Sequence, residues 1–377
     1  MILHQDCRHF RSDVPCSFHK LEGVHCDGCQ YYDPINFRIL IVKLDAMGDV
    51  LRTTCLLPGL KNKYPGSHIT WLTRRESTPL FVNNPYVDRV LDYSPESVVT
   101  VQLDEYDLVL GLDASPASAK ITSTANGKMK LGFGYDKRGF SYPLNSEATT
   151  WYEMGLFDDI KKKNNRTYQE IMAEIVGIAA VENKIIFKLT EEEKAMTRAL
   201  HKRLKLKTHS SIIGINAGAG RRWSNKKWHE KHAITLIKLL MKAGHHVLLL
   251  GGEEEKELNV RIVKAAGSKV IDTGCNHSVR VYAAIVDLCD VVVTMDTFTL
   301  HLGLALGKQM ISLFGPTSAV EIEMYNQGEK ILPDVECSCY YQKTCTADRQ
   351  CMETIEPKRV FEAIQKLAAH LTIRDSK

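Results

Sequence analysis

The stretch that determines the fold is Val291–Thr317, which reads VVVTMDTFTLHLGLALGKQMISLFGPT. Val291–Val293 is a β-branched run typical of a buried strand, and Met310–Phe314 has the composition of a second one. Between them, the leucines from Leu300 to Leu306 favour a short helix that Gly307 can end. The order of strand, helix and strand predicts a βαβ unit.

Asp296 and Thr297 directly precede this helix, and both side chains are suited to capping a helix start. The free N–H groups and the positive dipole end at such a start attract anions. We therefore expect the diphosphate of a nucleotide-sugar to lie here. An ordinary βαβ crossover without a ligand would have the same pattern.

Composition limits the function classes. The chain has 377 residues, of which 44% are hydrophobic and 25% charged, as in a soluble globular protein of two domains. The net charge of +4 comes without basic clusters interleaved with aromatic residues, which argues against nucleic acid binding. No apolar stretch has the length of a membrane span, and no apolar signal segment opens the chain. We expect a cytoplasmic protein, with peripheral contact at the inner membrane face left open.

Eight of the eleven cysteines form two groups of four, one near each end of the chain. In a cytosolic protein such groups favour metal over disulfides. In the first group, Cys26 and Cys29 form a C-x-x-C knuckle, which Cys7 and Cys16 can complete as a structural zinc or iron site. Residues 1–35 contain few aliphatic residues, so a metal would supply their folding energy. The alternative is a loose, reduced tail.

Apolar strands and helices alternate through the rest of the chain. Residues 36–190 are expected to form an N-terminal, acceptor-side Rossmann-like domain that opens with the strand Phe37–Leu44 and the helical stretch Val50–Lys63. Residues 191–356 are expected to form a second such domain, which binds the nucleotide-sugar, and residues 357–377 a helix that packs back. Two doubly wound sheets would thus face a cleft, with ligands beyond the carboxyl ends of their strands.

In the first domain, Gly48 and Asp49 follow the first strand. Gly48 lets the backbone approach a substrate, and an Asp49 carboxylate in the cleft can take a proton from an acceptor hydroxyl. Asp is also a favoured N-cap residue, which is the structural alternative. Asp45 and Asp113 are the other carboxylates at strand ends.

In the second domain, a Gly-rich turn, Asn216–Gly220, precedes a cluster of basic residues. Lys226, and next Arg222, are the cations expected to stabilise a leaving nucleoside diphosphate, although a solvated basic loop would look the same. Glu253 follows Gly251-Gly252 at the end of the next strand, where a carboxylate can accept hydrogen bonds from ribose hydroxyls. A helix-start Glu favoured by the dipole is equally consistent with this position.

Taken together, these residues resemble glycosyltransferase family 9, the ADP-heptose:lipopolysaccharide heptosyltransferases. The resemblance rests on three pieces in the family's order and covers most of residues 37–370: ILIVKLDAMGDVLRTTCLLPGLKNKYP; NAGAGRRWSNKKW followed by LLLGGEEE; and VVTMDTFTLHLGLALGK with SLFGPT. It implies a GT-B fold and transfer of heptose from an ADP-sugar with inversion and without a catalytic metal.

The resemblance also assigns roles. Asp49 matches the proposed catalytic base, and Lys226 matches the lysine that binds the donor's phosphates. Glu253 matches the residue at the ribose. The residues that match the donor-binding D-[ST]-G-x-x-H motif are Asp296, Thr297 and His301, and His277 falls near the position that contacts adenine.

Two features depart from the family. Phe298 stands where the motif has Gly, which would let the backbone approach phosphate without a Cβ. Members of the family also often lack the Cys-rich N-terminal segment. The second cysteine group, Cys337, Cys339, Cys345 and Cys351, resembles a Cys-rich insertion of many members, with a structural metal or plain reduced thiols as its two interpretations.

The sequence therefore predicts an inverting glycosyltransferase that moves a sugar, heptose by resemblance, from an ADP-sugar to a hydroxyl of lipopolysaccharide core or a related cell-surface glycan. Two alternatives stay open. One is a non-catalytic nucleotide-sugar-binding or scaffold protein, and the other is a GT-B-fold nucleotide-sugar epimerase.

Overall fold

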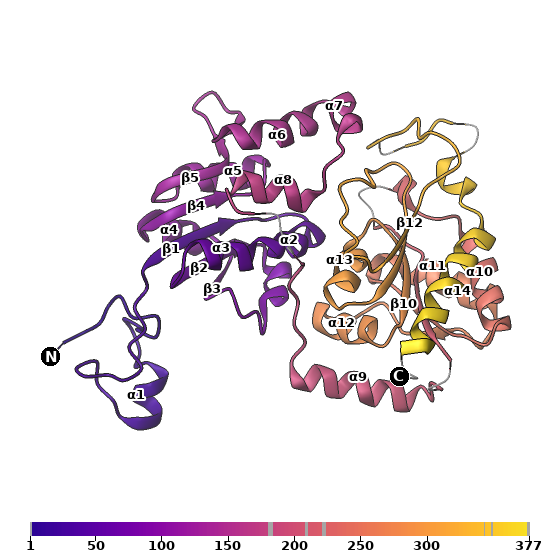
Figure 1. Ribbon diagram of the computed structural model, residues 1–377, viewed down its shortest axis with the longest axis horizontal. Helices are drawn as coiled ribbons and strands as arrows, with labels where there is room; N and C mark the ends of the chain where they lie inside the picture. The colour runs from indigo at the N-terminus through magenta and orange to yellow at the C-terminus, as the bar shows by residue number, and fades with distance from the viewer. Residues whose placement is uncertain are drawn as a thin grey trace.

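The computed structural model describes residues 2–179, 184–207, 210–220, 224–342, 344–347 and 350–374. Two β-sheets, each flanked by helices, form two lobes that lie side by side, with α9 (Glu191–Arg203) beneath the second lobe in Figure 1. Residues 184–190 lead from the first lobe into α9, which packs on α12 (Val279–Asp287). The charged helix α9 thus follows the connection between the lobes and is attached to the second lobe.

The first sheet has the strand order β3-β2-β1-β4-β5-β6. All neighbouring strands are parallel except β6, which is antiparallel to β5. This is the order of a doubly wound Rossmann sheet. Its strands are β1 (Phe37–Val42), β2 (Ser67–Thr73), β3 (Arg89–Asp92), β4 (Tyr106–Gly111), β5 (Gly127–Tyr135) and β6 (Ser141–Pro143).

The second sheet repeats this topology, with the order β12-β11-β10-β7-β8-β9 and every pair parallel. Each lobe therefore reverses its strand order between its first and fourth strands, at β1/β4 and at β7/β10. The strands are β7 (Ile212–Asn216), β8 (His246–Leu250), β9 (Ile271–Asp272), β10 (Val291–Met295), β11 (Gln309–Leu313) and β12 (Gly328–Ile331). The expected fold of two facing doubly wound sheets is confirmed.

Helices cover both faces of the first sheet. The helical stretch expected over Val50–Lys63 is split into α2, η1 and α3, because Pro58 lies in the first turn of α3 and lacks the N–H that a continuous helix needs. The helices are α2 (Met47–Thr53), η1 (Thr54–Leu56), α3 (Leu57–Lys63), η2 (Arg75–Phe81), α4 (Pro95–Leu103), α5 (Pro116–Thr124), η3 (Ser146–Ala148), α6 (Thr149–Leu156), α7 (Asp158–Lys163) and α8 (Tyr168–Ile175).

In the second lobe, α14 (Pro357–Arg374) packs against α10 and the sheet. The other helices after α9 and α12 are η4 (Ser224–Lys226), α10 (Glu230–Lys242), η5 (Glu253–Glu255), α11 (Lys256–Ala266), α13 (Phe298–Ala305) and η6 (Cys351–Thr354). Among the described residues, none of the helices combines the length and the apolar character needed to cross a bilayer.

An apolar core joins the two lobes. Leu51 on α2 and Tyr168 on α8 belong to the same buried cluster as Leu300 on α13 and Ile322. Burial of this apolar surface favours the arrangement in which α2 and α13 lie against each other. The start of α2 in the first lobe and the start of α13 in the second lobe therefore lie next to each other.

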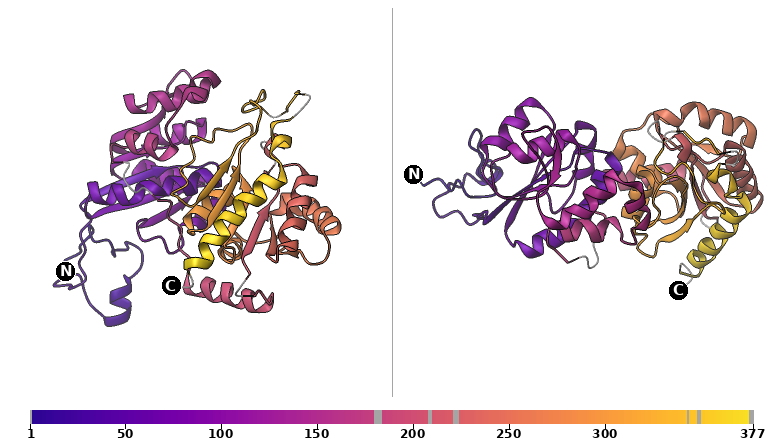
Figure 2. Two further views of the ribbon diagram at one scale, coloured as in Figure 1. Left: turned by 45° about the vertical axis from the view of Figure 1, so that its right-hand side comes forward. Right: turned by 90° about the horizontal axis from the view of Figure 1, so that it is seen from above.

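The N-terminal segment projects from the first lobe, away from the second, as Figure 2 shows. It contains α1 (Ser17–Glu22) and is tied to the lobe by Arg8. The Arg8 guanidinium pairs with Asp33 at 2.9 Å and with Asp88, and it donates to the backbone oxygen of Ser67.

Candidate active site

A cavity of about 850 Å³ lies where the carboxyl ends of the two sheets meet. Its wall combines residues that follow β1 and residues of α6 and α7 with residues that follow β7, β8, β10 and β11. In open parallel sheets, ligands bind beyond the carboxyl ends of the strands, where the strand order reverses. The cavity therefore lies at the expected ligand-binding position of the first sheet and also at that of the second.

Asp49 reaches the cavity because α2 begins soon after β1. Ala46 is the N-cap residue of α2, and Asp49 is the third helical residue. The Oδ2 atom of Asp49 accepts a hydrogen bond from the backbone N–H of Ala46 at 3.3 Å, and its Oδ1 lies 2.8 Å from Nη2 of Arg52. The alternative that Asp49 is the N-cap residue is therefore wrong, although its side chain does bind the helix start.

Two cations act on this carboxylate. Burial alone would raise the pKa of Asp49, but the charges of Arg52 and of Lys43, which is buried just after β1, outweigh burial and hold that pKa well below its usual range. The side chain of Asp49 is 33% exposed, so a ligand in the cavity can still reach it. Asp49 is thus an ionised acceptor of protons or hydrogen bonds on the first-lobe side.

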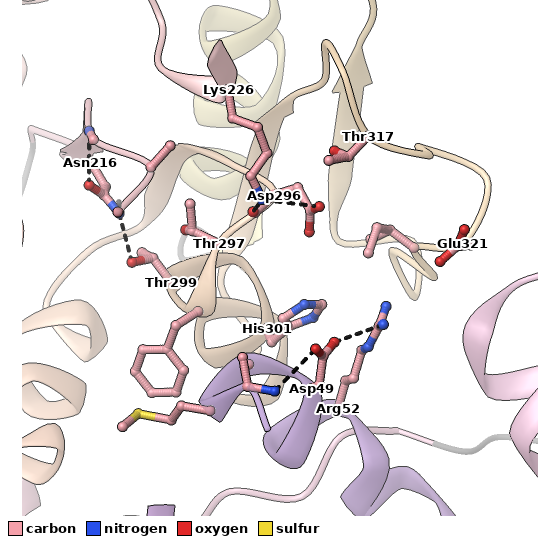
Figure 3. Close-up of a pocket in the computed structure, with 18 of the residues that line it drawn as sticks. Asp49, Arg52, Asn216, Lys226, Asp296, Thr297, Thr299, His301, Thr317 and Glu321 are labelled. Atoms are coloured by element: carbon pink, nitrogen blue, oxygen red, sulfur yellow. Dashed lines mark hydrogen bonds and ion pairs between the residues drawn. The ribbon is translucent and has the colours of Figure 1, made fainter. Parts of the chain in front are cut away.

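The start of α13 faces Asp49 from the second lobe (Figure 3). Thr297 is the N-cap residue, but its side chain makes no capping hydrogen bond, and its Oγ1 instead lies 2.9 Å from Oγ1 of Thr294. The expected side-chain cap at Thr297 is therefore wrong. Because the cap side chain does not occupy the first N–H groups of α13, this helix start retains the character of an anion site.

Lys226 places a positive charge beside this helix start. Its Nζ donates to the backbone oxygen of Asp296 at 2.6 Å and lies 3.5 Å from Oδ2 of the same residue. Burial would raise the pKa of Asp296, but the charge of Lys226, together with His301 and Arg52, lowers that pKa below its usual range. The side chain of Lys226 is 12% exposed. Lys226, Asp296 and the start of α13 together form a cationic, amide-lined wall.

A buried hydrogen-bond network fixes α13 in place. Nδ2 of Asn216 donates to Oγ1 of Thr299 at 2.9 Å, and the hydroxyl of Tyr282 lies 2.7 Å from the same oxygen. All three residues are buried. The network joins the ends of β7, α12 and α13, which holds the helix start at a defined position above the cavity.

The two lobes lie close together at Gly48. A Cβ at this position would lie 3.1 Å from Cδ2 of His301 and 3.4 Å from Cα of Phe298, so glycine allows this close contact of α2 with α13. His301 is buried, and burial together with the charge of Arg52 lowers its pKa to about 4. The imidazole is therefore neutral at physiological pH and carries no positive charge into the cavity.

The structure brings most of the predicted site residues together. The cavity is lined by Gly48, Asp49, Lys226, His277, Asp296, Thr297 and His301. The ring Nε2 of His277 lies 2.7 Å from the backbone oxygen of Thr273, which holds the ring in place. Arg222 lies outside the described residues.

The carboxylate that reaches the cavity after β8 is Glu255 and not the expected Glu253. Glu253 is exposed and is not among the residues that line the cavity, whereas Glu255, two residues further on, is buried and lines it. The Glu255 carboxylate accepts backbone N–H groups of Gly220 at 3.2 Å and Gly252 at 3.0 Å. The other two carboxylates expected at strand ends do not line the cavity: Asp45 accepts a hydrogen bond from Arg74, and Asp113 accepts one from Ser118.

Phe298, which replaces the glycine of the motif, is the first helical residue of α13 and lines the cavity. Its ring lies toward Tyr282, with ring centroids 6.4 Å apart. The ring therefore adds an aromatic surface to the cavity wall on the side of α12, where the glycine of the motif would have no side chain.

Several cavity residues were not identified from the sequence. Arg52 lies one helical turn after Asp49, a spacing that predicts an ion pair on a helix. Glu321 and Tyr341 come from irregular segments after β11 and β12, and Trp151 and Lys161 come from α6 and α7. No sequence motif indicated that these residues belong to the site.

The N-terminal cysteines gather around one small cavity of about 250 Å³, whose lining includes Cys7, Cys16, Cys26 and Cys29 together with His9, His19 and His25. In the second group, the sulfur atoms of Cys337 and Cys339 lie 3.6 Å apart, and burial raises the pKa of Cys351. Across the part of the chain that the structure describes, no group of three or more His, Cys, Asp or Glu side chains has an arrangement that could hold a metal ion. A structural zinc or iron at either group stays a prediction.

Two doubly wound lobes that enclose such a cavity define the GT-B class of fold. The profile of glycosyltransferase family 9 (heptosyltransferase) matches residues 100–351. The lipooligosaccharide heptosyltransferase 2 of Campylobacter jejuni (serotype O:6, strain 81116) is 26% identical over 251 residues, which are 64% of this chain and 77% of that protein.

Solved structures agree with this fold. A glycosyl transferase family 9 protein from Veillonella parvula superposes with a TM-score of 0.74 at 16% identity, covering 89% of this chain and 98% of the other. The E. coli heptosyltransferase WaaC, solved with ADP, superposes with a TM-score of 0.58 at 22% identity, covering 88% and 99%. The chain belongs to glycosyltransferase family 9, and it is a glycosyltransferase.

Proposed function

We propose that this enzyme transfers heptose from an ADP-heptose donor, with inversion, to a hydroxyl group of lipopolysaccharide core or a related glycan at the cytoplasmic face of the membrane. The observation that carries the proposal is the pairing across one cavity of an ionised carboxylate from the first lobe, Asp49, with the cationic wall of Lys226 and the start of α13 in the second. An E. coli relative solved with ADP supports the donor.

In this proposal, Asp49 accepts the proton of the acceptor hydroxyl as its oxygen attacks the anomeric carbon. The bond between that carbon and the diphosphate oxygen breaks, and its electron pair leaves with ADP. Attack comes from the face opposite the leaving group, so the configuration at the anomeric carbon inverts. The proton ends on Asp49, and the negative charge ends on the diphosphate.

The second lobe stabilises this leaving group. Lys226 supplies a positive charge, and the first N–H groups of α13 supply hydrogen-bond donors that are already oriented before the reaction. Because Asp296 holds the Lys226 ammonium at 2.6 Å through its backbone oxygen, the cation keeps one position through the reaction. Enclosure between the lobes excludes water, which limits hydrolysis of the donor.

The nucleoside is expected at the α12 side of the cavity. His277, Val279 and Tyr282 line this part together with Gly251 and Gly252 after β8. We propose that the ribose lies beside Gly252, within reach of the Glu255 carboxylate rather than of the exposed Glu253. The Phe298 ring contributes an apolar face to the same region.

The test is a transfer assay with purified enzyme, ADP-heptose and a lipopolysaccharide acceptor that lacks heptose. We expect ADP release that depends on the acceptor, and a product of inverted anomeric configuration by NMR. Conversion of the donor without acceptor would instead indicate the epimerase, and donor binding without transfer to any acceptor would indicate the scaffold protein. A thermal-shift comparison of ADP-, GDP-, UDP- and dTDP-sugars tests the base, because a bound ligand raises the melting temperature.

A further inference from the structure

The connection between β11 and β12 meets helices of the first lobe at the side of the cavity. The backbone N–H of Tyr168, at the start of α8, donates to the backbone oxygen of Glu321 at 2.9 Å, and Nε2 of Gln169 donates to the hydroxyl of Tyr325 at 2.8 Å. Residues about 150 positions apart in sequence are thus held together by direct hydrogen bonds. The segment that carries Glu321 is therefore attached to α8 of the first lobe.

The Glu321 carboxylate is buried in the wall of the cavity and incompletely bonded. Only 5% of its side chain is exposed. Its Oε1 atom lies 3.6 Å from Nζ of Lys161, beyond hydrogen-bond distance, and has no hydrogen-bond partner among the described residues. A buried carboxylate oxygen normally accepts at least one hydrogen bond, because leaving it without a partner is costly. Since Glu321 lines the cavity, a ligand can supply the missing donor.

Aromatic and cationic groups surround this carboxylate. Trp151 on α6 and Tyr341 line the same cavity. Nζ of Lys161 lies 4.0 Å from the ring centre of Tyr341 and 5.8 Å from that of Trp151. Aromatic faces carry partial negative charge and attract the C–H groups of a sugar ring, whereas a carboxylate accepts hydrogen bonds from its hydroxyls. This combination suits a polyhydroxylated ring.

The position of Glu321 places this site beside the reacting atoms. In Figure 3, Glu321 and Asp49 lie on either side of the Arg52 guanidinium, which is bonded to Asp49 at 2.8 Å. The negative charge of Glu321 helps to raise the pKa of Arg52. The nucleoside side of the cavity, near Tyr282, is formed by other elements of the second lobe. Glu321 therefore belongs to the sugar end of the cavity.

We propose that Glu321, with Trp151, Lys161 and Tyr341, forms a sugar subsite in which the Glu321 carboxylate accepts hydrogen bonds from hydroxyl groups of a sugar ring next to the bond being made or broken. This inference rests on the proposed transferase function and adds the groups that recognise the sugar. Two rings have the required chemistry, the heptose of the donor and the terminal sugar of the acceptor.

The test compares Glu321→Gln with Glu329→Gln, which removes an equal charge from an exposed position on β12. For each variant, the affinities for ADP and for ADP-heptose are measured by calorimetry, and KM is measured for donor and acceptor. Because a hydrogen bond to a charged group is lost, we expect Glu321→Gln to weaken the binding of one sugar substrate by about ten- to a hundredfold. Affinity for ADP, which lacks the sugar, is expected to match that of wild type.

The substrate that is affected identifies the ring. Weaker binding of ADP-heptose but not of ADP assigns the subsite to the donor sugar, and a raised KM for the acceptor alone assigns it to the acceptor. Unchanged binding and KM for both sugar substrates would overturn the inference, as would equal losses for ADP and ADP-heptose. The calorimetric arm does not need turnover, so absence of transfer by the wild type would count against the proposed function alone.

Two variants of Trp151 test the subsite independently, in case Glu321→Gln does not fold. Trp151→Leu removes an aromatic face from the same wall, and Trp151→Phe keeps one. We expect the leucine variant to weaken the same substrate as Glu321→Gln, the phenylalanine variant to restore most of that binding, and both to bind ADP like wild type. If the leucine variant binds both sugar substrates like wild type, the subsite is wrong.

Discussion

Nη2 of Arg52 lies 2.8 Å from Oδ1 of Asp49, one helical turn away on α2. Arg52 also lies over the ring of Tyr168, with its guanidinium carbon 3.8 Å from the ring centre. The cation is thus held from two sides and cannot easily leave the carboxylate. Asp49 is therefore ionised but paired, and in the proposed reaction the acceptor hydroxyl would approach through its exposed edge.

This pair leads to a prediction for the pH dependence of the reaction. Arg52→Met removes the main charge that lowers the pKa of Asp49, so burial should then raise that pKa. A base must be deprotonated to act, and the acid limb of kcat/KM should therefore move toward neutral pH. Arg52→Lys keeps the charge and should move the limb less. Identical acid limbs in wild type and Arg52→Met would show that Asp49 does not control this part of the profile.

The role of Lys226 is tested by replacing it with methionine, which keeps much of its length and removes its charge. A charge-assisted bond to the diphosphate would be lost, so we expect ADP to bind about ten- to a hundredfold more weakly by calorimetry. Lys227→Met is the matched control, because Lys227 is the next residue, is exposed and does not line the cavity. Equal ADP affinity of the two variants would exclude Lys226 from the phosphate site.

His301 makes stability depend on pH. Its pKa in the folded protein is about 4, below the ordinary value of 6.5, so the folded state favours the neutral ring. The corresponding stability is present above pH 6.5 and is lost as the pH falls toward 4. Between pH 7 and pH 5 the wild type should lose about 2 kcal/mol of unfolding free energy more than His301→Gln. Urea denaturation at the two pH values measures this difference, and parallel losses would contradict it.

The central strands of both lobes could be predicted because each is a short apolar run, whereas the edge strands β6, β9 and β12 are too short or too polar to be recognised. The expected strand Phe37–Leu44 contains β1, and Val291–Val293 lies within β10. The fold class followed from the alternation of these runs with amphipathic helices. The break in the helix before Pro58 was missed, since the apolar spacing continues across it and only the missing N–H of proline interrupts the helix.

Two carboxylates of the site could be predicted because they come soon after the carboxyl end of a strand. Asp296 directly follows β10 and Asp49 lies in the first turn of the helix after β1, so both satisfy this rule, and both line the cavity. Glu253 shows its limit: three glutamates follow Gly252, and the turn η5 directs Glu255 rather than Glu253 inward, which composition cannot distinguish. Glu321 was missed because its place depends on a contact between the two lobes.

The central claim is that the Asp49 carboxylate is the catalytic base, and turnover of Asp49→Asn tests it most directly. Asp45→Asn is the control, because the Asp45 carboxylate lies at the same strand end but binds Arg74 at 2.6 and 2.9 Å outside the cavity. With donor and acceptor saturating, we predict that Asp49→Asn loses at least about a hundredfold in kcat while binding ADP-heptose like wild type, and that Asp45→Asn keeps its turnover. A kcat of Asp49→Asn equal to that of wild type would contradict the account.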